Sequence, residues 1–101
     1  MKAAIPLFKN RVSPNFSTAQ EVLLVQAEGG RVCATWKIDL TPLSVTERRV
    51  MLLNLGIDTI FCGGIDEMSH IWLGGQGILV IDNQMGDAVE ILDKYLNTSI
   101  K

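Results

Sequence analysis

Residues 58–82 read DTIFCGGIDEMSHIWLGGQGILVID, and this stretch determines the class of fold. Its two ends, 58–62 and 78–82, are short apolar runs with the length and β-branched content of buried strands. Between them a helix is predicted from about Asp66, and the glycine-rich run 74–77 ends it. Two strands joined through a helix pair in parallel, with a right-handed crossover. The stretch therefore predicts an α/β fold.

The chain before this unit contains three further predicted strands. They cover residues 2–8, 21–27 and 31–40. The run 21–27 is apolar at both odd and even positions, which predicts a strand buried on both faces. The turn Glu28-Gly29-Gly30 joins it to the next strand as an antiparallel hairpin.

The strand predicted at 31–40 alternates apolar and polar residues. This pattern is typical of a half-exposed strand at a sheet edge. Its expected apolar face consists of Val32, Ala34, Trp36, Ile38 and Leu40. Cys33 falls on the opposite, polar face.

Two more helices complete the predicted order. The sequence Ser44-Val45-Thr46-Glu47 is a capping box, and the helix that it opens runs to about Leu55 and stops at Gly56. The last helix covers about 86–96 and has apolar residues at helical spacing. The order is β-β-β-α-β-α-β-α, which predicts one α/β domain over residues 1–101, with a mixed sheet and helices on its faces.

Composition excludes several classes of function. The 101 residues carry a net charge of −2, so we expect no nucleic-acid partner. The one tight basic pair, Arg48-Arg49, is interpreted as a solvated face of its helix.

Since no apolar run reaches the roughly 18 residues of a membrane span, no membrane association is expected. The N-terminal run is broken by Pro6 and is interpreted as a strand instead of a signal peptide. The two cysteines lie 29 positions apart in sequence and predict no disulfide framework, which favours a reduced, cytoplasmic setting.

A ligand site is predicted at one edge of the sheet. Ligands of open α/β sheets bind outside the carboxyl ends of the parallel strands. If the strands 2–8, 58–62 and 78–82 are parallel neighbours, three segments meet there: the long loop 9–20, the turn 62–64 and the turn 82–86.

The residues of these segments suit an anionic, sulfur-rich ligand. Cys62 and Met85 offer soft sulfur donors. Gly63 and Gly64 allow close approach to backbone N–H groups at the start of a helix. The loop 9–20 adds a mobile cation and hydrogen-bonding groups, which are those of Arg11, Ser13, Asn15 and Ser17.

Plainer interpretations of the same residues stay open. A lone cysteine at a strand end is often a packed hydrophobe, as Cys62 could be.

Helical spacing puts four apolar residues on one side of their helix, namely Ile65, Met68, Ile71 and Trp72. His70 lies almost opposite, toward solvent. A cysteine nucleophile needs a neighbouring base, and with His70 pointing away we expect no enzyme.

The chain resembles a known family, the dinitrogenase iron–molybdenum cofactor-binding domain. The resemblance rests on MKAAIPLFKNRVSPNFSTA at the N-terminus, a capped helix, GIDTIFCGGI, GQGILVI and a final GDAVEILDKYL. It runs over nearly the whole chain, and RVSPNFSTA and the CGGI turn are its most specific parts.

The resemblance implies a ribonuclease H-like fold with a five-stranded mixed sheet, and a non-catalytic carrier of a metal–sulfur cluster. The cargo would be the iron–molybdenum cofactor, its precursor, or a related molybdenum-, copper- or iron–sulfur cluster. Many members carry a histidine before the phenylalanine of the first loop, where this chain has Asn15 before Phe16.

Two hypotheses of different classes follow. In the first, Cys62 is a thiolate ligand of the metal or a contact just outside its direct ligands, and the amides of Gly63 and Gly64 hold cluster sulfides. Arg11 and Ser13 of the first loop close over the cargo, which a donor or recipient protein exchanges. In the second, the domain is a protein–protein or regulatory module that has lost the cluster. Either form is expected to be a monomer or a weak dimer. An enzyme that uses Cys62 as a nucleophile is a third, weaker interpretation.

Overall fold

The computed structural model describes residues 1–100 and shows an α/β fold with a mixed sheet and three helices. The strands are β1 (Lys2–Phe8), β2 (Arg11–Val12), β3 (Glu21–Glu28), β4 (Arg31–Asp39), β5 (Thr59–Phe61) and β6 (Leu79–Ile81). The helices are α1 (Val45–Asn54), α2 (Glu67–Gly75) and α3 (Ala88–Ile100), and a short 3₁₀ turn, η1, covers Phe16–Thr18. The predicted order is confirmed, with β2 and η1 added inside the long first loop.

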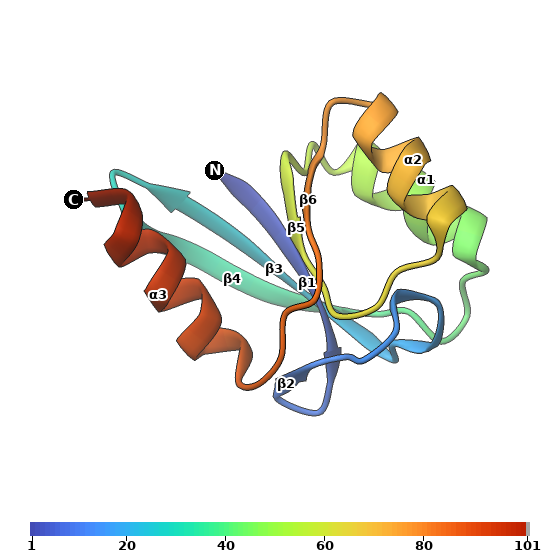
Figure 1. Ribbon diagram of the computed structural model, residues 1–101, viewed down its shortest axis with the longest axis horizontal. Helices are drawn as coiled ribbons and strands as arrows, with labels where there is room; N and C mark the ends of the chain where they lie inside the picture. The colour runs from blue at the N-terminus through green and yellow to red at the C-terminus, as the bar shows by residue number, and fades with distance from the viewer. Residues whose placement is uncertain (101) are drawn as a thin grey trace.

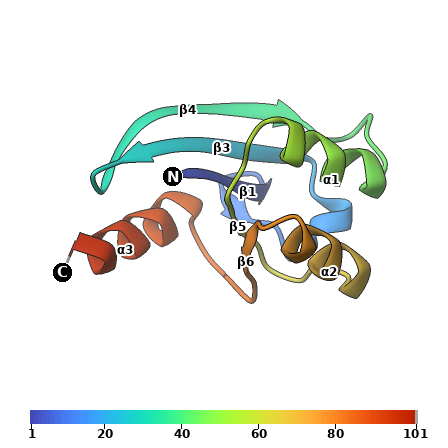
Figure 2. The same cartoon turned by 90° about the horizontal axis from the view of Figure 1, so that it is seen from above.

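The sheet has the order β4-β3-β1-β5-β6, and β2 pairs with β1 outside this path. The pairs β1–β5 and β5–β6 are parallel, whereas β1–β3 and β3–β4 are antiparallel. The parallel neighbours expected from the strand–helix–strand pattern are therefore present. Figure 2 shows β4 as the outermost strand, beyond β3 and β1.

Helices cover both faces of the sheet. Figure 1 shows α1 and α2 together on one side of the sheet and α3 on the other. Each side has its own core. The core beneath α1 and α2 includes Leu24, Leu52, Ile60 and Leu73, and the core beneath α3 includes Ile5, Val25, Phe61 and Leu92. Strand β3 contributes buried side chains to both, as its continuous apolar sequence predicts.

The capping signals in the sequence act as expected. The N–H of Glu47 donates to Ser44 Oγ at 3.1 Å, and the N–H of Ser44 donates to Glu47 Oε1 at 3.0 Å. Gly56 ends the helix with a φ of 74°, a left-handed conformation that glycine adopts without steric cost. Asp66 caps α2 by accepting from the N–H of Ser69 at 3.0 Å.

The prediction for the apolar face of β4 is wrong at one end. Ala34 lies opposite Gln26 of β3, but Val32 lies opposite Ala27, so Cys33 is an extra residue in a β-bulge. A bulge reverses the alternation of side chains beyond it. Val32 therefore lies on the α3 side of the sheet, and Ala34, Trp36 and Ile38 lie on the other. As the strand is also an edge, Val32 and Trp36 stay 42% and 40% exposed.

The predicted apolar side of α2 is also wrong in part. Met68 and Ile71 are 73% and 64% exposed, and the side chains that enter the core are those of Ser69 and Leu73. The short strand β6 leaves little sheet beneath this helix, so only its inner edge is covered. His70 is exposed, as predicted.

Arg48 corrects the interpretation of the basic pair. Only 6% of this residue is exposed, and its guanidinium donates to four backbone carbonyls. They are those of Phe16 at 3.0 Å, Ser17 at 3.1 Å, Leu40 at 2.9 Å and Leu43 at 3.2 Å. Burial lowers the pKa of Arg48. The side chain joins α1 to η1 and to the segment after β4. This role could not be predicted from the sequence, because a basic pair is usually solvated.

Candidate functional site

The three predicted segments do meet at one edge, where β1, β5 and β6 end. The N–H of Cys62 donates to the carbonyl of Ile81 at 3.0 Å, and the N–H of Gln84 donates to the carbonyl of Cys62 at 2.9 Å. The turn after β5 and the turn after β6 are thus hydrogen-bonded to each other. The N–H of Asn83 adds a bond to the carbonyl of Gly63 at 3.0 Å.

The long first loop is bonded to both turns. The N–H of Gly64 donates to the carbonyl of Pro14 at 2.7 Å, and the N–H of Phe16 donates to the carbonyl of Gly64 at 2.9 Å. On its other side, the N–H of Val12 donates to the carbonyl of Gly86 at 2.9 Å. The first loop therefore lies closed over this edge of the sheet.

The two glycines of the turn serve this close packing. A Cβ atom at Gly64 would lie 2.7 Å from the carbonyl oxygen of Pro14 and 3.1 Å from Oδ1 of Asn15. The N–H of Gly64, which the sequence suggested as a ligand donor, already donates within the chain. Gly63 is buried beneath the same loop.

Cys62 is fully buried, with 0% of its surface exposed, and it belongs to the core beneath α1 and α2. Burial, and to a lesser degree the negative charge of Asp82, raise the pKa of the thiol from 9.0 to about 12. A thiol in this state is protonated at neutral pH and is not an activated nucleophile. The arrangement fits the packed-hydrophobe interpretation of Cys62.

The remaining predicted residues divide between the interior and the rim. Ser13 is buried, and its hydroxyl donates to the carbonyl of Asn15 at 2.9 Å. Arg11 and Asn15 are exposed, and Met85 is 84% exposed. Arg11 lies beside Asp87 in an antiparallel bridge, two residues beyond Met85. The exposed Arg11 and the exposed Met85 thus lie on two loops that are hydrogen-bonded to each other, while Cys62 lies inside.

Metal-ligand geometry is absent from the described residues. Within residues 1–100 no group of three or more His, Cys, Asp or Glu side chains is placed to hold a metal ion. Across the same range, no helix has both the length and the apolar content to cross a lipid bilayer.

Comparisons with known proteins give structural likeness only. No model of a known protein family matches the chain, and no curated protein matches it. The solved structure of the protein PH0822 superposes with a TM-score of 0.91 at 18% identity, over 97% of this chain and 90% of that one.

Two further structures share the fold. A protein from Methanocaldococcus jannaschii, provisionally described as a dinitrogenase, has a TM-score of 0.80 at 19% identity, over 100% of this chain and 92% of its own. A Thermotoga protein provisionally described as a NifB protein has a TM-score of 0.73 at 16% identity, over 95% and 87% of the two chains. At these identities the likeness establishes the fold.

Proposed function

We propose that this protein is a non-catalytic binding protein whose cargo is an anionic metal–sulfur cluster. The observation that carries the proposal comes from the exposed rim of the sheet edge at which the three loops meet. There the exposed cation of Arg11 and the exposed thioether of Met85 lie on two loops that are hydrogen-bonded to each other. A thioether is a soft donor, and a guanidinium attracts a cluster of negative charge.

Two further observations support this assignment. The fold is shared with proteins provisionally described as a dinitrogenase and as a NifB protein. The segments RVSPNFSTA and CGGI, which carry the sequence resemblance to the cofactor-binding family, both lie at this edge of the sheet. The cargo would be an iron–molybdenum cofactor, its precursor, or a related metal–sulfur cluster, exchanged with a donor or recipient protein. The proposal includes no catalytic step.

The closed edge favours different roles for the exposed and the buried candidate residues. Arg11 and Met85 would make the first contact with the cluster, because they are exposed. Cys62 does not fit a ligand role while the first loop lies over it, because its thiol is buried and protonated. Ligation by Cys62 would require the loop to lift from Gly63 and Gly64, and its new position over the cluster would then bring Ser13 and Asn15 toward the cargo.

Anaerobic reconstitution with a molybdenum–iron–sulfur cluster tests the proposal, read by absorbance and by metal analysis after gel filtration. Met85→Ala and Arg11→Met are expected to lower uptake, and Cys62→Ala to lower retention far more than His70→Ala. His70 is the matched control because it is exposed on α2, away from the turn. Equal retention by the Cys62 and His70 variants would remove Cys62 from the site, and equal behaviour of all four would overturn the proposal.

A second function is favoured by the burial of Cys62 and by the outer surface of α2. Met68 and Ile71 are exposed there, beside Trp72, and the Arg49 guanidinium lies 5.7 Å from the centre of the Trp72 ring. Exposed apolar side chains around one cation are typical of a protein-binding surface. In this alternative the domain is an interaction module without cargo. A protein that stays colourless after reconstitution, yet binds one specific partner through Met68 and Ile71, would support it.

A further inference from the structure

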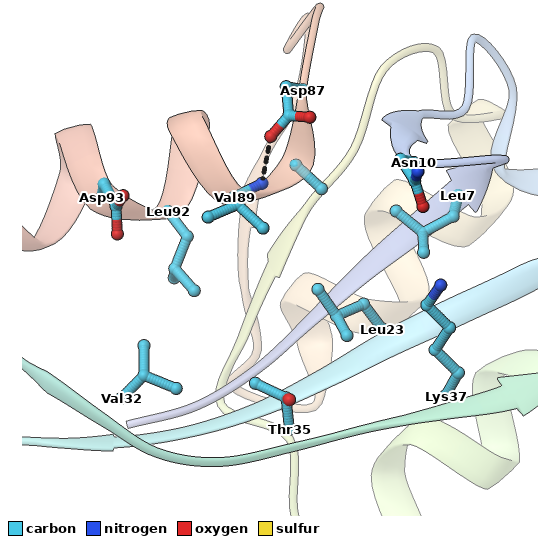
Figure 3. Close-up of a pocket in the computed structure, with 11 residues that line it drawn as sticks. Leu7, Asn10, Leu23, Val32, Thr35, Lys37, Asp87, Val89, Leu92 and Asp93 are labelled. Atoms are coloured by element: carbon cyan, nitrogen blue, oxygen red, sulfur yellow. Dashed lines mark hydrogen bonds between the residues drawn. The ribbon is translucent and has the colours of Figure 1, made fainter.

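A groove runs along the α3 side of the sheet, between the N-terminal half of α3 and the strands β3 and β4 (Figure 3). Its volume is about 580 Å³, within the range of small-molecule sites. The site residues discussed above do not line it. It is open because β4 bends away from α3 at the sheet edge, so the helix covers β1 and β3 but leaves β4 exposed.

The floor of the groove is apolar. It is formed by side chains from three strands and one helix, namely Leu7, Leu23, Val32 and Leu92. Val32 reaches this side only because of the bulge at Cys33, since regular alternation would place it on the opposite face with Ala34. β-Bulges commonly redirect a side chain beside a functional site. Along β4 the floor runs for about 15 Å between Val32 and Lys37, from the rise per residue of a strand. Thr35 lies between these two residues and places one hydroxyl in the floor (Figure 3).

One end of the groove carries a positive charge without a partner. Lys37 lies opposite Leu23, on the α3 side of the sheet, and Figure 3 shows its ammonium group directed toward Leu7 and Asn10. In the part of the chain that the structure describes, no carboxylate or carbonyl pairs with this ammonium group. The side chain of Asn10 adds a hydrogen-bonding group at the same end.

The acidic residues of the groove do not neutralise this end. Oδ1 of Asp87 accepts from the N–H groups of Val89 at 2.9 Å and Glu90 at 3.1 Å, so its charge is directed at the first turn of α3. Asp93 lies toward the other end, beside Leu92 and across from Val32 (Figure 3). The groove is therefore mainly apolar along its length, with the Thr35 hydroxyl between the ends, cationic at one end and acidic at the other.

We propose that this groove binds an elongated, mainly apolar organic acid. The carboxylate of the ligand would pair with Lys37 and accept a hydrogen bond from the amide of Asn10, and its apolar body would lie over Leu23, Val32 and Leu92. Burial of the apolar body supplies most of the affinity, and Lys37 sets the direction in which the ligand lies.

Titration with decanoate, whose extended chain has a length comparable to that of the groove, tests this proposal. The titration is followed by methyl and amide NMR shifts at concentrations below micelle formation. Shifts are expected at Leu7, Leu23, Val32 and Leu92. Lys37→Met is expected to weaken decanoate binding by about fivefold, the upper range for an ion pair at an exposed site. Binding of decan-1-ol, which has no charge, should be the same for both proteins.

Arg31→Met is the matched control. Arg31 lies opposite Glu28, on the other face of β4 from Val32. The substitution therefore removes a cation from the same strand without changing the groove. Its affinity for decanoate should equal that of the unaltered protein. The proposal is overturned if decanoate produces no shifts at the groove residues, or if Lys37→Met and Arg31→Met bind it equally well. Since both side chains are exposed, neither variant should impair folding, and amide spectra of the two free proteins verify this.

Discussion

Gly63 lies so close to Ser13 that a Cβ atom at position 63 would come within 2.5 Å of the Ser13 carbonyl oxygen. The contact is between backbones, so neither partner can move aside by changing a rotamer. It lies beside the two hydrogen bonds between Gly64 and the first loop, which hold that loop against the turn that follows β5. The burial of the Cys62 thiol depends on this contact, because the first loop covers the turn that contains Cys62.

Gly63→Ala should therefore destabilise the protein. The added methyl group must push the Ser13–Pro14 backbone away, and overpacking of this kind costs about 1–3 kcal/mol. Urea denaturation followed by circular dichroism measures the loss. The same variant should expose Cys62 to thiol reagents in the folded state, provided that Cys33 is first replaced by Ser.

Gly74→Ala is the control for this experiment. Gly74 lies within α2, and a Cβ atom there would meet no atom within 4 Å. Alanine is favoured over glycine in a helix by roughly 0.5–1 kcal/mol, so this variant should be as stable as the unaltered protein or slightly more stable. Equal losses in the two variants would show that the close approach of Gly63 to Ser13 has no energetic consequence.

Arg48 provides a second prediction. Its four bonds to backbone carbonyls connect α1 to the first loop and to the segment after β4. Arg48→Met should lower the free energy of unfolding by about 3 kcal/mol, because buried carbonyls lose a charged donor. Arg48→Lys should lose most of the same energy, since one ammonium group cannot reproduce the planar set of donors.

The neighbouring Arg49 serves as the comparison for Arg48. It is half-buried, lies over the Trp72 ring and donates to Thr46 Oγ1 at 3.1 Å. Arg49→Met should cost no more than about 1 kcal/mol. Thermal and urea unfolding of the three variants measure these changes in the free energy of unfolding. Similar losses of stability at positions 48 and 49 would contradict the structural role of Arg48.

The raised pKa of Cys62 predicts a loss of stability at high pH. Burial and the charge of Asp82 raise this pKa to about 12 in the folded protein, while the unfolded thiol titrates near 9.0. Above pH 9 the unfolded state loses a proton that the folded state keeps, so alkali favours unfolding. The full stability is present below pH 9, and the contribution falls by about 1.4 kcal/mol per pH unit until the folded pKa is reached.

This dependence is isolated by comparing Cys62→Ala with its parent from pH 8 to 11, both carrying Cys33→Ser. The alanine variant should start less stable, because it leaves a small cavity. The difference in unfolding free energy between the two proteins should then shrink as the pH rises. A constant difference over this range would mean that the thiol has an ordinary pKa.

The buried side of α2 gives a fourth prediction. Leu73 is fully buried and Ile71 is 64% exposed, although the two are only two positions apart. Leu73→Ala should cost about 3 kcal/mol through lost contacts and a residual cavity. Ile71→Ala should change stability by no more than about 0.5 kcal/mol, as is usual for exposed positions. Equal effects would contradict the orientation of the helix.

Local patterns in the sequence were sufficient for the order of the elements. The strand–helix–strand run 58–82 required parallel pairing, and the capping box at Ser44 and Glu47 located the start of α1. Both signals act over a few residues, through backbone hydrogen bonds and through the spacing of apolar side chains. The meeting of three loops at one edge followed from the same pattern, because parallel strands end on the same side.

The sequence could not decide which candidate residues are accessible. Neither the residue type nor the neighbouring sequence of Cys62, Arg48 and Met68 indicates how much of each is exposed. The structure buries the first two and exposes the third. Burial depends on what a distant segment covers, and here the first loop and the edge of α2 determine it. The bulge at Cys33 is also non-local, since it arises from the pairing of β4 with β3.

The sequence by itself therefore determined the α/β order, the starts of α1 and α2, and the sheet edge at which the loops gather. Only the tertiary structure decided that the loop edge is closed, that the Cys62 thiol lies inside it, and that a groove opens beside β4. The physical reason is one of range. Periodicity and capping are properties of neighbouring residues, whereas solvent access and the pKa of a thiol depend on segments that meet only when the chain has folded.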